Sequence, residues 1–187
     1  MAVQTFTTGQ VLTAADTNTY LANSGLVYVK QLTISAGVSY VDLGTCFNSS
    51  YDNYVVSFTN IVTSTSASVL FSLLSGATAT SSGWYGTEFY CAIGGTTWTG
   101  QLAANNGAGA YCAASVGSTT AWSSIMQLQA PYLASYARFQ YGVIDNSYIR
   151  NGFAYHGANT SYDGLRCTLT SGTFTSGNIT VYGYRKG

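Results

Sequence analysis

The sequence predicts an all-β protein: an antiparallel β-sandwich of the jelly-roll-like type, preceded by a short N-terminal arm and helix. From Leu26 onward, short runs rich in β-branched and aromatic residues alternate with polar residues, as in half-buried strands. Clusters of Gly, Ser, Asn and Asp, which favour turns, stand between these runs. No helical pattern separates the runs, and this excludes a parallel α/β fold.

About ten strands with turns at this spacing are typical of sandwiches and jelly rolls. After a first strand around Val27 and Val29, the expected strands are Val38–Leu43, Tyr54–Val62, Val69–Leu74, Trp84–Ile93, Ala110–Val116, Trp122–Gln129, Tyr136–Ile144, Tyr148–His156, Arg166–Thr170 and Ile179–Tyr184. Turns are expected between them, among others at Gly94–Gly95 and at Asn105–Gly107.

Residues 1–25 differ from the rest and predict a separate anchoring segment. Met1 to Gly9 has the composition of an extended polar arm. Thr13 can cap a short helix from Ala14 to Ala22, which Asn23–Gly25 would end. A helix of under three turns is not stable alone, so it must pack on its own domain or on a neighbour. The chain therefore divides into an anchoring arm and helix, residues 1–25, and a β-sandwich domain, residues 26–187.

The charged fraction is unusually small. Six acidic and six basic residues make up 6% of the 187 residues, where about 25% is usual. Such a chain has little electrostatic protection against association, which favours a surface that other subunits cover. The alternative is a soluble monomer with a polar surface of Ser, Thr, Asn, Gln, Gly and Tyr.

Aromatic residues are the most informative part of the composition: three Trp, sixteen Tyr and eight Phe. Part of this set must fill the core. The remainder suits interfaces and flat sugar faces, because Tyr and Trp combine a large contact area with a polar tip. We expect these side chains to line subunit contacts and, secondarily, a glycan-binding face. The candidate surface or glycan contacts are Trp98, Tyr155 and Tyr162.

Residues with catalytic or metal-binding chemistry are sparse and scattered. No two acidic residues lie within five positions of each other, and His156 is the single histidine. No G-x-S-x-G motif accompanies it, so a Ser-His-Asp triad is not expected. The four cysteines form no C-x-x-C pair, which speaks against zinc and favours buried free thiols, although two disulfides stay open. The sequence thus predicts a protein that is not an enzyme, with no catalytic residues, no metal and no cofactor.

Two further classes of partner are not expected. The six basic residues are scattered, whereas phosphate binding needs them clustered, so no nucleic acid is expected. The N-terminus has no basic region followed by an apolar run, so no secretion signal is expected. No segment approaches 18 consecutive apolar residues, so no membrane insertion is expected.

Three segments resemble virion proteins of tailed bacteriophages. Gln4–Leu21, which reads QTFTTGQVLTAADTNTYL, resembles an N-terminal segment of tail-fibre-like and other virion proteins, written roughly Q-T-F-T-A-G-Q-V-L-T-A-A-x-x-N. Phe47–Ile61 is similar to a second recurrent segment of these proteins, F-S-S-x-Y-D-N-Y running into a strand. Ile179–Arg185 looks like their common last strand. The order and spacing suggest that the resemblance extends over the whole chain.

The resemblance implies a bacteriophage virion structural protein, assembled in the host cytoplasm, that is a homotrimer or otherwise symmetric. Its partners would be further copies of itself and other virion structural proteins. The aromatic residues described above add a host-surface glycan to the expected partners. The N-terminal segment would anchor it to the particle, with the β-domain outward and no catalytic residues. The anchoring side chains would be Phe6, Val11, Leu12, Tyr20 and Leu21.

The chain is short for a fibre and has no shaft repeat. The resemblance therefore leaves two positions open: a fibre or receptor-binding protein, and a capsid cement or decoration protein that clamps neighbouring capsid subunits. A third reading, a polysaccharide depolymerase, is disfavoured by the scattered acidic residues.

Overall fold

The structure is a computed structural model that describes residues 7–11, 13, 25–116, 120–144 and 147–186. Over these residues the chain is all-β, with thirteen strands in two antiparallel sheets and no helix. The predicted helix from Ala14 to Ala22 lies outside the described residues. So do the predicted anchor residues Phe6, Leu12, Tyr20 and Leu21, whereas Val11 is described and is 80% exposed.

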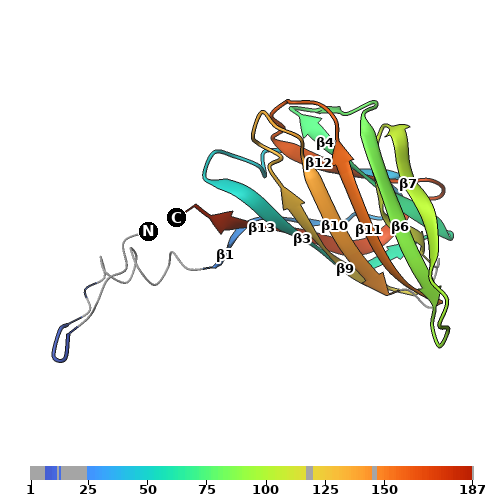
Figure 1. Cartoon of the computed structure of the whole chain (residues 1–187), viewed down its shortest axis with the longest axis horizontal. Coiled ribbons are helices and arrows are strands. Elements are labelled where there is room, and N and C mark those ends of the chain that lie inside the picture. Colours follow the sequence, from blue (N-terminus) through green and yellow to red (C-terminus); the bar gives the residue numbers. More distant parts are fainter. Residues whose placement is uncertain (1–6, 12, 14–24, 117–119, 145–146, 187) are drawn as a thin grey trace.

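Eight strands form the large sheet, which faces the viewer in Figure 1. In spatial order they are β1 (Leu26–Thr33), β13 (Phe174–Arg185), β3 (Tyr51–Thr63), β9 (Trp122–Gln129), β10 (Arg138–Ile144), β11 (Tyr148–His156), β6 (Trp84–Ala92) and β7 (Thr99–Gly107). All neighbours pair antiparallel, and β9, β10 and β11 follow one another as a meander.

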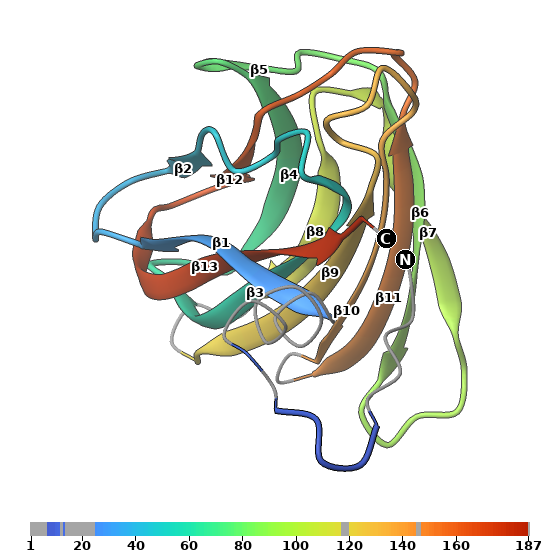
Figure 2. The same ribbon diagram turned by 90° about the vertical axis from the view of Figure 1, so that its left-hand side faces the viewer.

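The small sheet lies behind the large one, and Figure 2 shows the two layers from the side. Its strands are β2 (Tyr40–Leu43), β12 (Gly164–Leu169), β4 (Ala67–Ser75) and β5 (Thr78–Ala79), and β8 (Ala110–Val116) also pairs with β4. The chain crosses repeatedly between the sheets, for example from β1 to β2, then to β3, then to β4. The expected antiparallel sandwich is confirmed at this level.

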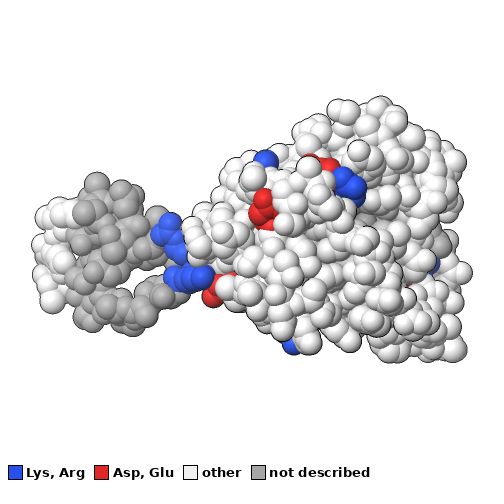
Figure 3. All heavy atoms as spheres, turned by 90° about the horizontal axis from the view of Figure 1, so that it is seen from above, with Lys and Arg blue, Asp and Glu red and all other residues white. Residues whose placement is uncertain are grey.

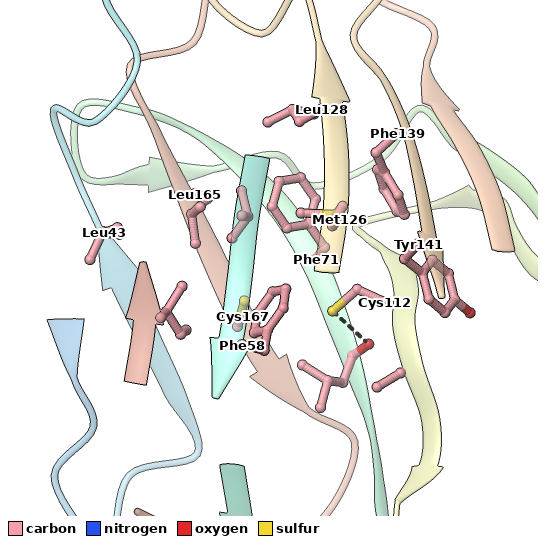
Figure 4. Packing of buried hydrophobic residues seen from close by; sticks show 14 of the residues in the cluster. Leu43, Phe58, Phe71, Cys112, Met126, Leu128, Phe139, Tyr141, Leu165 and Cys167 are labelled. Carbon is pink, nitrogen blue, oxygen red and sulfur yellow. Dashed lines mark hydrogen bonds between the residues drawn. The ribbon is translucent and has the colours of Figure 1, made fainter. Parts of the chain in front are cut away.

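The core forms where the inward side chains of the two sheets meet. Strict alternation along β9, β10 and β11 turns every second residue inward. From the large sheet, Phe139 packs against Phe71 of the small sheet, with ring centroids 5.2 Å apart. Trp84, fully buried, contacts both rings at 5.9 and 5.4 Å. Figure 4 shows this interior, with Met126 and Phe58 beside the same cluster.

The predicted strands match well where β-branched and aromatic residues are dense. β8, β9 and β11 have the predicted bounds, and β6 ends one residue earlier than expected. The prediction of a turn at Asn105–Gly107 is wrong, because these residues end strand β7. β7 can include turn-forming residues because its pairing with β6 has two register shifts, where a residue of β7 is left unpaired. At one of these shifts Asn106 adopts a left-handed conformation, with a φ of 55°. Asn60 on β3 has a similar φ of 52°.

All four cysteines are buried and free, which confirms the thiol interpretation and leaves no disulfide. Burial raises the pKa of Cys46 to about 12. Such thiols behave as small apolar side chains and not as nucleophiles.

Candidate functional site

The exposed side of the large sheet is the candidate functional surface. We call it the outer face and define its centre by the exposed outward residues of β9, β10, β11 and β6. These are Ser123, Ile125, Gln127, Gln129, Arg138, Gln140, Gly142, Ile144, Ile149, Asn151, Phe153, Tyr155, Tyr85 and Phe89. Because the strands alternate, each of these side chains stands on the side opposite the core.

The outer face carries almost no charge. Among the described outward positions of β9, β10, β11, β6 and β7, Arg138 is the single charged residue. At the start of β3, Asp52 is partly exposed and pairs with Lys186 at 2.7 Å. Glu88 and Arg150, on β6 and β11, point inward and are buried. Figure 3, a view onto another side of the molecule, also shows charged side chains at only a few places. An ordinary solvent-facing sheet would carry charges at many outward positions.

Strand register arranges the outer face in rows. The first row joins Gln129, Arg138, Tyr155 and Tyr85, which are directly opposite one another on successive strands. Tyr155 and Tyr85 stack with centroids 5.4 Å apart and an interplanar angle of 24°. Tyr136 continues the aromatic series 6.2 Å from Tyr155. This row combines flat ring faces with one cation and one amide.

The second row is amide-rich. Gln140 lies opposite Gln127 and donates from Nε2 to its Oε1 at 2.9 Å. Phe153 follows on β11. Together the two rows enclose a hollow of about 360 Å³, which we call the tyrosine groove. Its exposed lining consists of Tyr85, Gln127, Gln129, Arg138, Gln140, Phe153 and Tyr155.

Further along the sheet the outer face becomes aliphatic. Gly142 is exposed on β10 and has no side chain to fill the surface. Around it lies a wider hollow of about 590 Å³, whose lining includes Ile125, Ile144, Ile149 and Asn151. We call this the glycine hollow. It is open and apolar enough to receive side chains from another molecule.

The exposed side chains that line the tyrosine groove are aromatic rings, amides and one guanidinium. No carboxylate, thiol or imidazole side chain lines the tyrosine groove. Among the described residues, no group of three His, Cys, Asp or Glu side chains could hold a metal ion. Aromatic rings beside amides instead suit contact with sugars or with another protein surface.

The structure separates the three predicted contact residues. Tyr155 lines the tyrosine groove and is 42% exposed. Trp98, 53% exposed, lies in the loop between β6 and β7 next to Thr99, the partner of Tyr90. It is thus at the other end of β6 from Tyr85, roughly 20 Å away along the strand. Trp98 and Tyr155 therefore do not form one site.

The prediction that Tyr162 is a surface or glycan contact is wrong. Tyr162 is 6% exposed and belongs to the core cluster. Its hydroxyl lies 3.2 Å from Nδ1 of His156, and the two rings meet edge to face at 5.3 Å. Its neighbours Ser161 and Asp163 are polar, and this gave it the local signature of a surface aromatic. Tyr162 supports the fold and offers no contact area to a ligand.

His156 lies inside this cluster, and the hydrogen bonds around it fit the neutral imidazole. Its Nε2 lies 3.0 Å from the carbonyl oxygen of Ser82, which can only accept, so Nε2 carries the proton and Nδ1 accepts from the Tyr162 hydroxyl. The imidazole also packs on Trp84, with centroids 5.2 Å apart. Burial lowers the pKa of His156 below its ordinary value of 6.5.

A buried polar network underlies the outer face, and sequence reasoning missed it. Tyr141, Gly152, Glu88 and Gln101 lie opposite one another on β10, β11, β6 and β7. The Tyr141 side chain crosses over Gly152, and its hydroxyl donates to Oε2 of Glu88. Gln101 donates to Oε1 of the same carboxylate at 2.7 Å. The pKa of Tyr141 is raised by burial and by the charge of Glu88.

Arg150 completes the network. Its Nη1 lies 3.0 Å from Oε1 of Glu88, and its guanidinium lies over the rings of Tyr148 and Tyr90 at 4.7 and 5.2 Å. Glu88 is fully buried and Arg150 is 4% exposed, so the ion pair is shielded from solvent. The alternation of β6, which turns Trp84 and Glu88 to the same side, was the sequence signal for it. The network joins four strands and is structural.

No protein-family model matches this chain, and no curated protein or solved structure shows significant similarity to it. Within the described residues, no helix has the length and apolar character needed to cross a bilayer.

Gly152→Ala tests the buried network. A Cβ at this position would overlap the Tyr141 ring, so the ring must leave the Glu88 carboxylate. We expect the free energy of unfolding to fall by roughly 2–4 kcal/mol, measured by urea denaturation. Gly142→Ala on the neighbouring strand is the matched control. There the nearest atom is the exposed amide oxygen of Asn151 at 3.3 Å, and the loss should stay within about 1 kcal/mol. Equal losses would contradict this account.

His156 predicts a pH dependence of stability. The unfolded chain binds a proton at His156 near pH 6.5, whereas the folded chain binds it only at lower pH. The free energy of unfolding should therefore be at its full value above pH 6.5 and should decrease as the pH falls through the lowered pKa. Urea denaturation of the wild type and of His156→Gln at several pH values between neutral and mildly acidic checks this. In the variant, the free energy of unfolding should decrease less as the pH falls. If it decreases as much as in the wild type, other groups cause the pH dependence.

Proposed function

We propose that this protein is a structural component of a tailed-bacteriophage particle, of the fibre or receptor-binding type, and that it acts without catalysis. The observation that carries the proposal is the outer face: a broad sheet surface of aromatic, aliphatic and amide side chains whose centre carries one charge. Such a surface is suited to contact with other molecules. The resemblance of the Gln4–Leu21 segment to virion proteins supplies the biological setting.

In this proposal residues 1–25 anchor the protein to other virion proteins, and the sandwich projects outward with a jelly-roll-like topology. β1 begins directly after the anchor and pairs with β13, the last strand, with Leu26 opposite Tyr184. The first and last strands of the sandwich therefore have their outer ends, near Leu26 and Tyr184, on the same side of the domain (Figure 1). Attachment at this end leaves the remaining loops, including the one that carries Trp98, available to a host-surface glycan. The proposed location is the virion, with a homotrimer or another symmetric oligomer as the proposed unit.

A capsid cement protein is the alternative, because the same charge-poor face could clamp neighbouring capsid subunits. Copy number discriminates the two: a count that matches the capsid lattice favours cement, and a count that matches a few attachment points favours a fibre. A polysaccharide depolymerase is less well supported, because the tyrosine groove is lined by no acidic residue.

Removal of residues 1–22 should abolish incorporation into particles while leaving the β-domain folded, because the deleted segment precedes β1. Mass spectrometry of purified particles measures incorporation, and circular dichroism of the isolated protein checks the fold. Incorporation of the shortened protein at the normal level would refute the anchor assignment.

Glycan contact is tested by Trp98→Ala, in the loop outside the outer face. If this exposed ring stacks on sugars, the change should weaken binding to host-surface polysaccharide by about tenfold without changing the melting temperature. Biolayer interferometry on immobilised polysaccharide measures this. Tyr40→Ala, at a 49% exposed tyrosine of the small sheet, is the matched control and should bind normally. Normal binding by Trp98→Ala would argue against the glycan role.

A further inference from the structure

We infer that the outer face of the large sheet is the contact between copies of this chain. The inference rests on the proposed structural role and names the partner of that surface. It draws on the extent of the face, on its charge and on the shape of its centre.

The outer face is large enough for a stable interface. At the usual strand spacing of about 4.8 Å and rise of about 3.3 Å per residue, an eight-stranded sheet of this length offers on the order of 900 Å². A standard protein interface buries about 800 Å² on each partner. Exposed apolar side chains extend across the sheet, from Tyr184 on β13 through Ile125 and Phe153 to Leu102 on β7. The surface is therefore one continuous face and not a set of isolated residues.

Charge selects a second copy as the occupant. A partner with an ordinary surface would bury its Lys, Arg, Asp and Glu side chains against the centre of the outer face, which holds no acidic residue and a single base, and unpaired buried charges are strongly unfavourable. A second copy brings an equally uncharged face. Its amides can satisfy those of the first, because each Gln and Asn both donates and accepts. The outer face is thus chemically complementary to itself.

The position of the glycine hollow indicates where the centre of the contact lies. Arg138 lies in the first row, near one end of the strands, whereas the glycine hollow lies further along them. Copies that meet over the glycine hollow bury Ile125, Ile144 and Ile149 and keep Arg138 at the hydrated rim. An apolar side chain of one copy can enter the hollow that Gly142 leaves in the other. The loop that carries Trp98 is not part of this face and remains free for other partners.

The full-length chain tests the inference by light scattering coupled to size exclusion. At micromolar concentration the wild type should have a multiple of the 19.7 kDa chain mass. Phe153→Arg and Ile125→Glu, both at exposed positions, place a charge in the contact and should weaken association by roughly 30-fold or more. Leu70→Arg is the matched control: it is an outward, half-buried apolar residue of β4 in the small sheet and should leave the mass unchanged.

A second measurement does not depend on destabilising variants. Asn151→Cys places a thiol at the centre of the outer face, and Ser81→Cys places one at an exposed position outside it. In the wild-type background, maleimide should label the Asn151→Cys thiol at least tenfold more slowly than the Ser81→Cys thiol, because a second copy covers it.

Two results would overturn the inference: a wild-type chain that stays monomeric at high micromolar concentration, or oligomers in which Asn151→Cys labels as fast as Ser81→Cys. A monomer whose outer face binds polysaccharide would assign the face to glycan instead. Neither result bears on incorporation into particles. Conversely, absence from particles would remove the virion role and leave the contact between copies intact.

Discussion

The fold depends on the packing of inward aromatic side chains between two antiparallel sheets. Phe71 of the small sheet meets Phe139 and Trp84 of the large sheet, and all three are almost fully buried. Strict alternation along β9, β10 and β11 makes this packing possible, since it turns every second residue inward. The same alternation turns the other half of these residues outward. The core and the outer face are therefore two consequences of one constraint.

That constraint explains why charge is distributed as it is. The charged residues of β6 and β11 point inward, where Glu88 and Arg150 satisfy each other together with Tyr141 and Gln101. A buried ion pair of this kind contributes little net stability but resists any change of register, because a slip would leave each charge unpaired. The network fixes how β10, β11, β6 and β7 align. It thereby fixes which side chains share a row on the outer face.

The outer face carries the functional proposals for the same reason. Its rings, amides and aliphatic side chains provide contact area and hydrogen bonds without charge, and its hollows arise where Gly142 and the row of tyrosines shape the surface. A contact between copies and a glycan contact place different demands on this surface. The first uses the aliphatic centre, and the second uses exposed rings such as Trp98 beyond its edge. An assembled protein can satisfy both because the two regions are separate.

The sequence by itself determined the fold class and most strand positions, because dense β-branched and aromatic runs such as Trp122–Gln129 form strands in almost any antiparallel context. It also determined that the surface is poor in charge, since composition does not depend on folding. Only the tertiary structure decided that Asn105–Gly107 belong to a strand, that Tyr162 is buried beside His156, and that Tyr141 reaches Glu88 across Gly152. These features arise from pairing and packing between residues distant in the chain, and local sequence patterns carry no record of such contacts.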